Sequence, residues 1–194
     1  MTRSRLIDLL RRAVAISDGQ RLILAGSQAL YAVTSSPPEM VERSEEADLL
    51  LVMTGRPLFE RLEAELGMRS AYLVQTGVFA HPVGLGTISL PRGWEPRLVA
   101  FGGDEGLENV WALEVHDLAA SKLMAGREKD LGFLIEAHRR ELFSLETLLD
   151  RFGDFRLGAF KNAVEDRLGK LENALESARL SPEARLVRNR MGQK

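Results

Sequence analysis

The stretch from Leu22 to Met53 constrains the fold of this chain more than any other. It contains two apolar runs, residues 22–25 and 47–53, which are short and bounded by polar residues. Runs of this kind are typical of strands that are buried on both faces. A glycine-serine pair, Gly26-Ser27, follows the first run and opens a short helix. The sequence therefore predicts a strand, a tight turn, a helix and a second strand.

The remainder of the chain adds helices and further short strands to this frame. Apolar residues recur at helical spacing over residues 6–16 and 58–66. Short or alternating apolar stretches predict strands at residues 87–90, 97–101 and 110–115. Residues 71–83 predict either one strand or two short strands that turn at residues 75–77. Helical patterns dominate from residue 116 and end in a frayed basic tail over residues 182–194. We therefore expect an α+β (α/β) fold, with a mixed-sheet core over residues 1–115 and a helical region, residues 116–194, packed on it.

The composition excludes several classes of protein. The chain has 194 residues, and its formal net charge of −2 gives no global basic field that would attract nucleic acid. It has no cysteine, which rules out disulfides, thiolate zinc sites and cysteine nucleophiles. No apolar run approaches the roughly 20 residues that a membrane helix needs. The first residues predict an amphipathic helix and not a signal peptide, so we expect a cytoplasmic protein with no membrane partner.

The glycine-serine turn has the features of a phosphate site. Glycine lets a phosphate approach the backbone closely, and the free N–H groups at the start of a helix attract its negative charge. The hydroxyl of Ser27 adds one more donor. The alternative is that Gly26 and Ser27 form an ordinary structural turn between a strand and a helix.

Two acids stand at the entrance of the second strand. Residues i and i+2 of a strand point to the same face, so Glu46 and Asp48 would lie side by side. Neighbouring carboxylates repel each other unless a cation lies between them. Carboxylates together with substrate phosphates are the ligands that Mg²⁺ prefers. The alternative is that Glu46 belongs to the preceding loop and that Asp48 caps an element or pairs with Arg43.

The order and spacing of these elements resemble the nucleotidyltransferase superfamily, which includes DNA polymerase beta. Its members carry a hydrophobic strand, a Gly-Ser or Gly-Gly turn, a helix, and an Asp-x-Asp pair on the next strand. Here Gly26-Ser27 matches the turn, and the run from Arg43 to Asp48 looks like the Arg-x-Thr-x-Asp-Ile-Asp variant. That variant is typical of the abortive-infection toxin branch (AbiEii-like) and of neighbouring bacterial families such as DUF6036.

A later stretch resembles the same branch. There, a helix bearing Asp-Leu-x-x-x-Lys-Leu is followed by Arg-x-Lys-Asp, and Asp117 to Leu123 and Arg127 to Asp130 are similar to it. The resemblance implies that Lys122 and Arg127 bind a nucleoside triphosphate and that Asp130 completes the polar site. Lysine offers a point charge to phosphate, and arginine offers a bidentate grip. The alternative is that all three are surface charges and that Asp130 caps the next helix.

Two departures from the family pattern concern the metal. Glu46 stands where the family has aspartate, and its extra methylene moves the carboxylate oxygens by about a bond length. The superfamily's third carboxylate, on a later strand, has no counterpart here, and His81 is best placed to replace it. Histidine is a poor Mg²⁺ ligand and a good ligand for transition metals. His81 is therefore a stand-in ligand, a general base, or a partly buried polar residue without a catalytic role.

The resemblance implies transfer of a nucleotidyl group from a nucleoside triphosphate to an acceptor hydroxyl on RNA or protein. Glu46, Asp48 and His81 are the expected catalytic residues, and Mg²⁺ or Mn²⁺ is the expected cofactor, held by Glu46 and Asp48. Gly26, Ser27, Lys122, Arg127 and Asp130 are the expected nucleotide-binding residues. A transfer RNA as acceptor, or an antitoxin protein as the partner of a toxin, is compatible with such a branch. The alternative function is a catalytically degenerate nucleotide-binding or protein-interaction module of the same fold.

Overall fold

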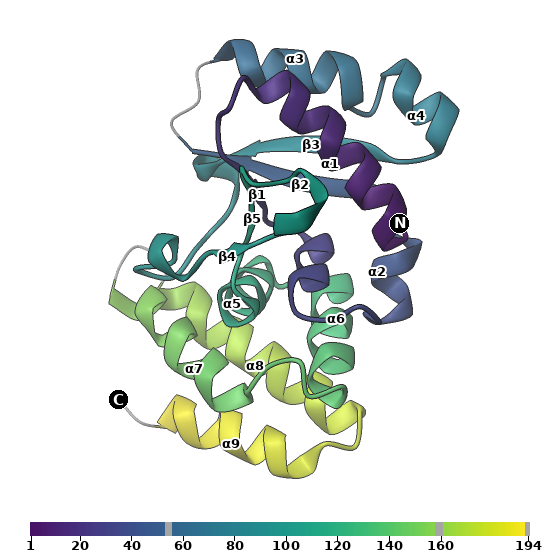
Figure 1. Cartoon of the computed structure of the whole chain (residues 1–194). Helices are drawn as coiled ribbons and strands as arrows, with labels where there is room; N and C mark the ends of the chain where they lie inside the picture. Colours follow the sequence, from purple (N-terminus) through teal and green to yellow (C-terminus); the bar gives the residue numbers. More distant parts are fainter. Residues whose placement is uncertain (53–55, 158–160, 193–194) are drawn as a thin grey trace. The chain divides into compact units, whose positions relative to one another are not determined.

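A computed structural model describes residues 1–52, 56–157 and 161–192, and the chain divides into two compact units (Figure 1). The first unit comprises Met1–Ile88 and Glu95–Glu114, and the second comprises Ser89–Trp94 and Val115–Lys194. We expected a boundary after residue 115, and the division between the two units falls one residue earlier, between Glu114 and Val115. The sequence did not indicate that the short segment Ser89–Trp94 belongs with the second unit. That the helical region packs on the core stays a prediction.

The first unit is built on a five-stranded mixed sheet, as the fold-class prediction requires. The strand order is β3-β2-β1-β5-β4. Strand β1 pairs antiparallel with β2 and parallel with β5, β2 pairs parallel with β3, and β4 pairs antiparallel with β5. The strands are β1 (Leu22–Leu24), β2 (Glu46–Leu51), β3 (Phe79–Gly84), β4 (Val99–Ala100) and β5 (Val110–Ala112). The two apolar runs thus form neighbouring central strands, and the predicted strand at residues 87–90 is wrong.

The pairing of β1 with β2 brings the glycine-serine turn beside the acidic pair. Leu24 lies opposite Leu49, and the backbone N–H of Ala25 donates to the backbone oxygen of Asp48 at 3.0 Å. All of β1 and the apolar positions of β2 are buried, which anchors both strands in the core. Gly26 follows directly, so the fold places the turn next to Asp48.

Amphipathic helices cover the sheet of the first unit. Helix α1 (Arg3–Ser17) buries Leu6, Leu9 and Leu10 and packs against α3 (Arg56–Leu66), which contacts β3 (Figure 1). The remaining helices of this unit are η1 (Ser27–Ala32), α2 (Glu39–Arg43), α4 (Ala71–Thr76), η2 (Leu85–Thr87), η3 (Glu95–Arg97) and η4 (Gly103–Glu105). The predicted strand over residues 71–83 is wrong in its first half, where α4 forms.

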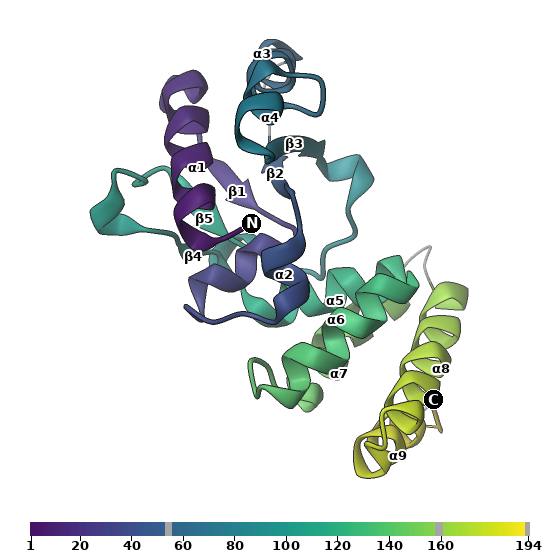
Figure 2. The same ribbon diagram turned by 90° about the vertical axis from the view of Figure 1, so that its right-hand side faces the viewer.

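Apart from the segment Ser89–Trp94, the described part of the second unit consists of helices and the turns that join them. Helix α5 packs against α6, α7 and α8, while α8 and α9 run side by side (Figure 2). Its helices are α5 (Val115–Ala125), α6 (Glu128–Arg139), α7 (Leu145–Gly153), η5 (Asp154–Leu157), α8 (Lys161–Ser177) and α9 (Ser181–Gly192). The predicted frayed tail is wrong, because α9 buries Ala184 and Val187. Among the described residues, no helix is long and apolar enough to cross a membrane.

Candidate metal centre

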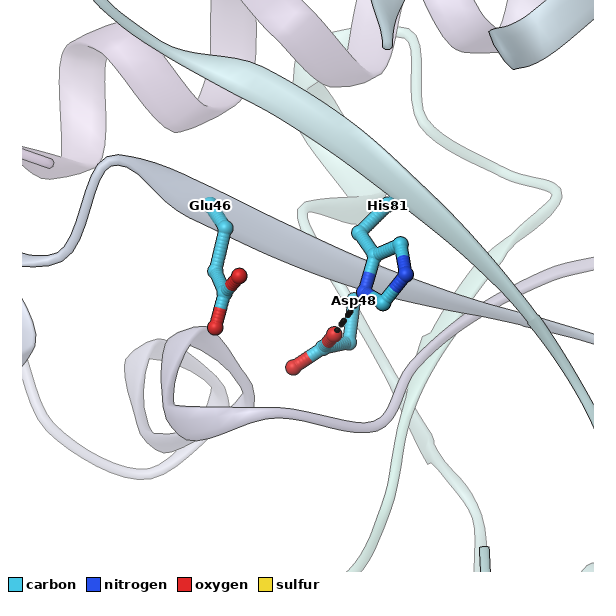
Figure 3. Close-up of side chains that lie close together, drawn as sticks. All are labelled: Glu46, Asp48 and His81. Atoms are coloured by element: carbon cyan, nitrogen blue, oxygen red, sulfur yellow. Dashed lines mark hydrogen bonds and ion pairs between the residues drawn. The ribbon is translucent and has the colours of Figure 1, made fainter. Parts of the chain in front are cut away.

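The three side chains predicted to be catalytic lie on adjacent strands and converge. Glu46 and Asp48 lie two residues apart on β2, and Asp48 lies opposite His81 of β3 in the parallel register. Their side chains project from the same side of the two strands (Figure 3). One ligand atom from each residue lies within 4.8 Å of the others. The closest contact joins Nδ1 of His81 to Oδ1 of Asp48, at 3.0 Å.

These separations fit the coordination sphere of a small divalent ion. For metal–ligand bonds of about 2.1 Å, adjacent octahedral ligands lie about 3.0 Å apart and opposite ones about 4.2 Å apart. The Nδ1–Oδ1 distance of 3.0 Å corresponds to the adjacent arrangement. The upper limit of 4.8 Å is slightly longer than the opposite arrangement. A small rotation of the glutamate side chain closes that difference, so the donor set fits a metal ion.

The structure excludes the two alternatives for the acidic pair. Glu46 is the first residue of β2 and pairs in register with Phe79, so it does not belong to the preceding loop. Arg43 pairs with Glu39 at 2.5 Å and not with Asp48. Asp48 has His81 as its partner, and the histidine side chain is 49% exposed, so it does not point into the core.

Gly26 leaves room for the carboxylate of Asp48. A Cβ atom at this position would lie 2.0 Å from Oδ2 of Asp48, far inside any normal contact. The absence of a side chain therefore admits the acid, and this is a different reason for glycine from the close approach of a phosphate that the sequence suggested. Oδ2 of Asp48 faces the turn, while Oδ1 faces His81. The site around Asp48 therefore has two sides, one next to Gly26 and one next to His81.

The helix that follows the turn differs from the expected phosphate-binding helix. It is a 3₁₀ helix of six residues, Ser27–Ala32, which aligns fewer peptide dipoles than a longer α-helix. Its N-cap residue, Gly26, makes no side-chain hydrogen bond. The half-buried Ser27 is the first residue of this helix. The role of Gly26 and Ser27 in phosphate binding stays a prediction.

Lys122, Arg127 and Asp130 form their own cluster in the second unit. The carboxylate of Asp130 is 1% exposed and accepts from Nε of Arg127 at 2.5 Å and from Nζ of Lys122 at 3.3 Å. The lysine ammonium also lies 4.5 Å from the ring centroid of Phe133. Asp130 is the third residue of α6, whose N-cap is Arg127, so the capping alternative is wrong. That these residues bind a triphosphate stays a prediction.

A comparison with protein families identifies the chain. Residues 4–176 match the model of a family described as a nucleotidyltransferase of unknown function (DUF6036). The chain belongs to this family. The match spans all eight predicted site residues, which are the three catalytic and the five nucleotide-binding ones. No match was found among curated proteins or among solved structures.

This nucleotidyltransferase family member has a cavity beside His81 that the sequence did not reveal. Its volume is about 530 Å³, and it is lined by Phe59, Glu63, Ala64, Met68, Arg69, Phe79 and His81. Phe59 and Met68 are unusually exposed for large apolar side chains, at 39% and 60%. In the sequence they belong to an amphipathic helix and the turn after it, a pattern without a functional signal. Exposure of apolar residues next to a candidate metal ligand becomes visible only in three dimensions.

Proposed function

We propose that the protein transfers a nucleotidyl group from a nucleoside triphosphate to an acceptor hydroxyl. The observation that carries the proposal is the convergence of Glu46, Asp48 and His81 beside the Gly26-Ser27 turn in a member of a nucleotidyltransferase family. A core related to that of DNA polymerase beta and a place near the AbiEii-like toxins belong to this proposal.

The two sides of Asp48 receive different substrates in this scheme. The triphosphate lies on the side of Gly26, where Ser27 donates its hydroxyl to the β- or γ-phosphate. The acceptor enters on the side of His81, where the cavity provides about 530 Å³ of open space. Glu46 and Asp48 hold the divalent ion, Mg²⁺ or Mn²⁺, which when bound supplies charge neutralisation for the phosphoryl oxygens.

The transfer forms one bond and breaks one. The acceptor oxygen attacks the α-phosphorus, the bond from that phosphorus to the bridging oxygen of the β-phosphate breaks, and pyrophosphate leaves. The hydroxyl proton passes to solvent or to His81. Because Nδ1 of His81 contacts Asp48, Nε2 is the nitrogen that would accept the proton.

A catalytically degenerate module that binds nucleotides or a protein partner is the second candidate. It is favoured by the donor set, because Glu46 and His81 replace two carboxylates of the superfamily and His81 bonds directly to Asp48. The toxin hypothesis is a biological role for the active form. It predicts growth arrest on expression that depends on Ser27 and Lys122.

Label transfer separates the two candidates. Purified protein is incubated with each labelled nucleoside triphosphate, Mg²⁺ or Mn²⁺, and total RNA or a cell extract. Glu45→Gln is the matched control for Asp48→Asn, because Glu45 is an exposed neighbour whose side chain lies outside the cluster. Transfer by the wild type and by Glu45→Gln, but not by Asp48→Asn, supports the enzyme. Triphosphate binding that survives Asp48→Asn, without transfer by any of the three proteins, supports the module.

A further inference from the structure

We propose that His81 is the third protein ligand of the metal site and that it makes the site selective for Mn²⁺ over Mg²⁺. The inference rests on the proposed function, because it names the ion that the transfer site takes. It also assigns His81 as a ligand through Nδ1. A neutral imidazole bound through Nδ1 carries its proton on Nε2, so of the two proton acceptors named for the transfer, solvent is the one that remains.

Backbone geometry holds the nitrogen in position for this role. Asp48 and His81 are register partners on the paired strands β2 and β3, so strand pairing fixes their relative positions. Residues on paired strands hold a site more accurately than residues on loops. Nδ1 and Oδ1 are 3.0 Å apart, which is about the spacing of adjacent ligands around an ion with bonds near 2.1 Å. A metal ion can therefore take the place of this hydrogen bond without a change in the backbone.

The chemistry of the donors selects the ion. Mg²⁺ prefers six oxygen ligands and binds imidazole poorly, so it would use Glu46 and Asp48 and leave His81 out. Imidazole nitrogen favours first-row transition metals, whereas two carboxylates favour hard ions such as Mn²⁺. Mn²⁺ satisfies both preferences and, like Mg²⁺, binds phosphate oxygens. The combination of two carboxylates and one imidazole therefore favours Mn²⁺.

Surface exposure leaves open coordination positions for substrate. The side chains of His81 and Asp48 are 49% and 28% exposed, and Glu46 is half-buried. Three protein ligands occupy half of an octahedral sphere, so about three positions remain for water or phosphate oxygens. A closed structural metal site would bury its ligands. The exposure here fits an ion that also binds substrate.

Metal titration tests the proposal without any measurement of activity. Mn²⁺ is added to the full-length protein, free Mn²⁺ is measured by electron paramagnetic resonance, and Mg²⁺ is then added as competitor. We expect the wild type to bind Mn²⁺ more tightly than Mg²⁺. The loss of an outer-shell partner of a metal ligand already costs about 10- to 100-fold in affinity. Removing a ligand by His81→Ala should therefore weaken Mn²⁺ binding by at least about 10-fold and change Mg²⁺ binding little. His81→Asp restores an oxygen ligand and should strengthen Mg²⁺ binding relative to Mn²⁺.

Two results would overturn the assignment. Either Mg²⁺ displaces Mn²⁺ from the wild type at equal concentration, or His81→Ala binds Mn²⁺ as tightly as the wild type does. The second result would leave His81 as a base or a surface partner of Asp48. Circular dichroism checks that the variants are folded, which the exposure of His81 favours. Intact Mn²⁺ selectivity without label transfer refutes the proposed function alone, and label transfer with unchanged selectivity in His81→Asp refutes the metal assignment alone.

Discussion

Replacing Gly26 with alanine tests whether this glycine exists to admit the Asp48 carboxylate. Gly26 has φ −94° and ψ −164°, an extended conformation that alanine adopts without strain. Any effect therefore comes from the added methyl group, whose carbon would lie 2.0 Å from Oδ2 and 2.9 Å from the carboxyl carbon of Asp48. Because normal contacts between heavy atoms are about 3.5 Å, the Asp48 side chain must move by roughly 1.5 Å.

The movement affects stability and metal binding differently. The side chain of Asp48 is 28% exposed and can turn toward solvent. We therefore expect a loss of about 1 kcal/mol in the free energy of unfolding, at the low end for overpacking. The same movement takes Oδ1 away from Nδ1 of His81, which lies at 3.0 Å. Displacing a metal ligand by this amount should weaken Mn²⁺ binding by about 10- to 100-fold.

Gly84→Ala is the matched control. Gly84 ends β3 on the same sheet, and a Cβ atom there meets nothing within 4 Å. Mn²⁺ affinity is measured by electron paramagnetic resonance, and the free energy of unfolding by urea denaturation. If Gly26→Ala binds Mn²⁺ as tightly as Gly84→Ala, Asp48 does not need the space that Gly26 leaves, and the steric argument fails.

Three further predictions concern stability. Gly126→Ala should be more destabilising than Gly77→Ala in urea denaturation, since both glycines have positive φ but only Gly126 would also place a Cβ 2.3 Å from the Arg167 side chain; equal losses would exclude the steric contribution. Arg151→Met should cost about 2–3 kcal/mol, because it removes an ion pair at 2.7 Å from the fully buried Asp117, whereas Arg56→Met, in an exposed pair, should cost less than about 0.5 kcal/mol. Arg3 lowers the pKa of Glu105 below its ordinary value of 4.5 chiefly through a side-chain hydrogen bond, so this pair stabilises the fold above that value and the contribution is lost as pH falls through the lowered pKa. Glu105→Gln should therefore reduce stability at pH 7 by up to about 1 kcal/mol and converge with the wild type in acid, and a difference that persists at low pH would contradict this.

Local patterns in the sequence were sufficient to predict the central strands. The runs at residues 22–25 and 47–53 are apolar enough that only a buried position suits them, and they form β1 and β2. Helix α3 has its apolar residues on one side, and α7 begins at the Ser144 cap, whose hydroxyl accepts from the N–H of Thr147. Each of these signals lies within a few residues of the element that it predicts.

Two of the wrong predictions, a strand in place of α4 and a frayed tail in place of α9, concern segments whose local sequence does not clearly favour one structure. Residues 71–76 contain Tyr72 and Val74, whose alternation suggested a strand, but Ser70 caps a helix there and Gly77 ends it with φ +72°. Val74 is 87% exposed, so its apolar character reports no buried face. Helix α9 was missed because its arginines pair with acids far away in the sequence. Arg188 contacts Glu172, and Arg190 contacts Asp150.

The register of β3 against β2 is the part of the site that no local pattern specifies. Side chains alternate between the faces of a strand, so a shift of one residue would move His81 to the opposite face and place Ala80 or Pro82 beside Asp48. The actual register is fixed at one end, where the N–H of Phe79 donates to the oxygen of Glu45 at 2.9 Å. It is also favoured by burial, because Ala80 and Pro82 are buried while His81 is exposed. The apolar residues on either side of His81 thus select the register that brings its imidazole to Asp48. Replacing Ala80 with a polar residue would therefore disturb the candidate metal site without changing any of its three side chains.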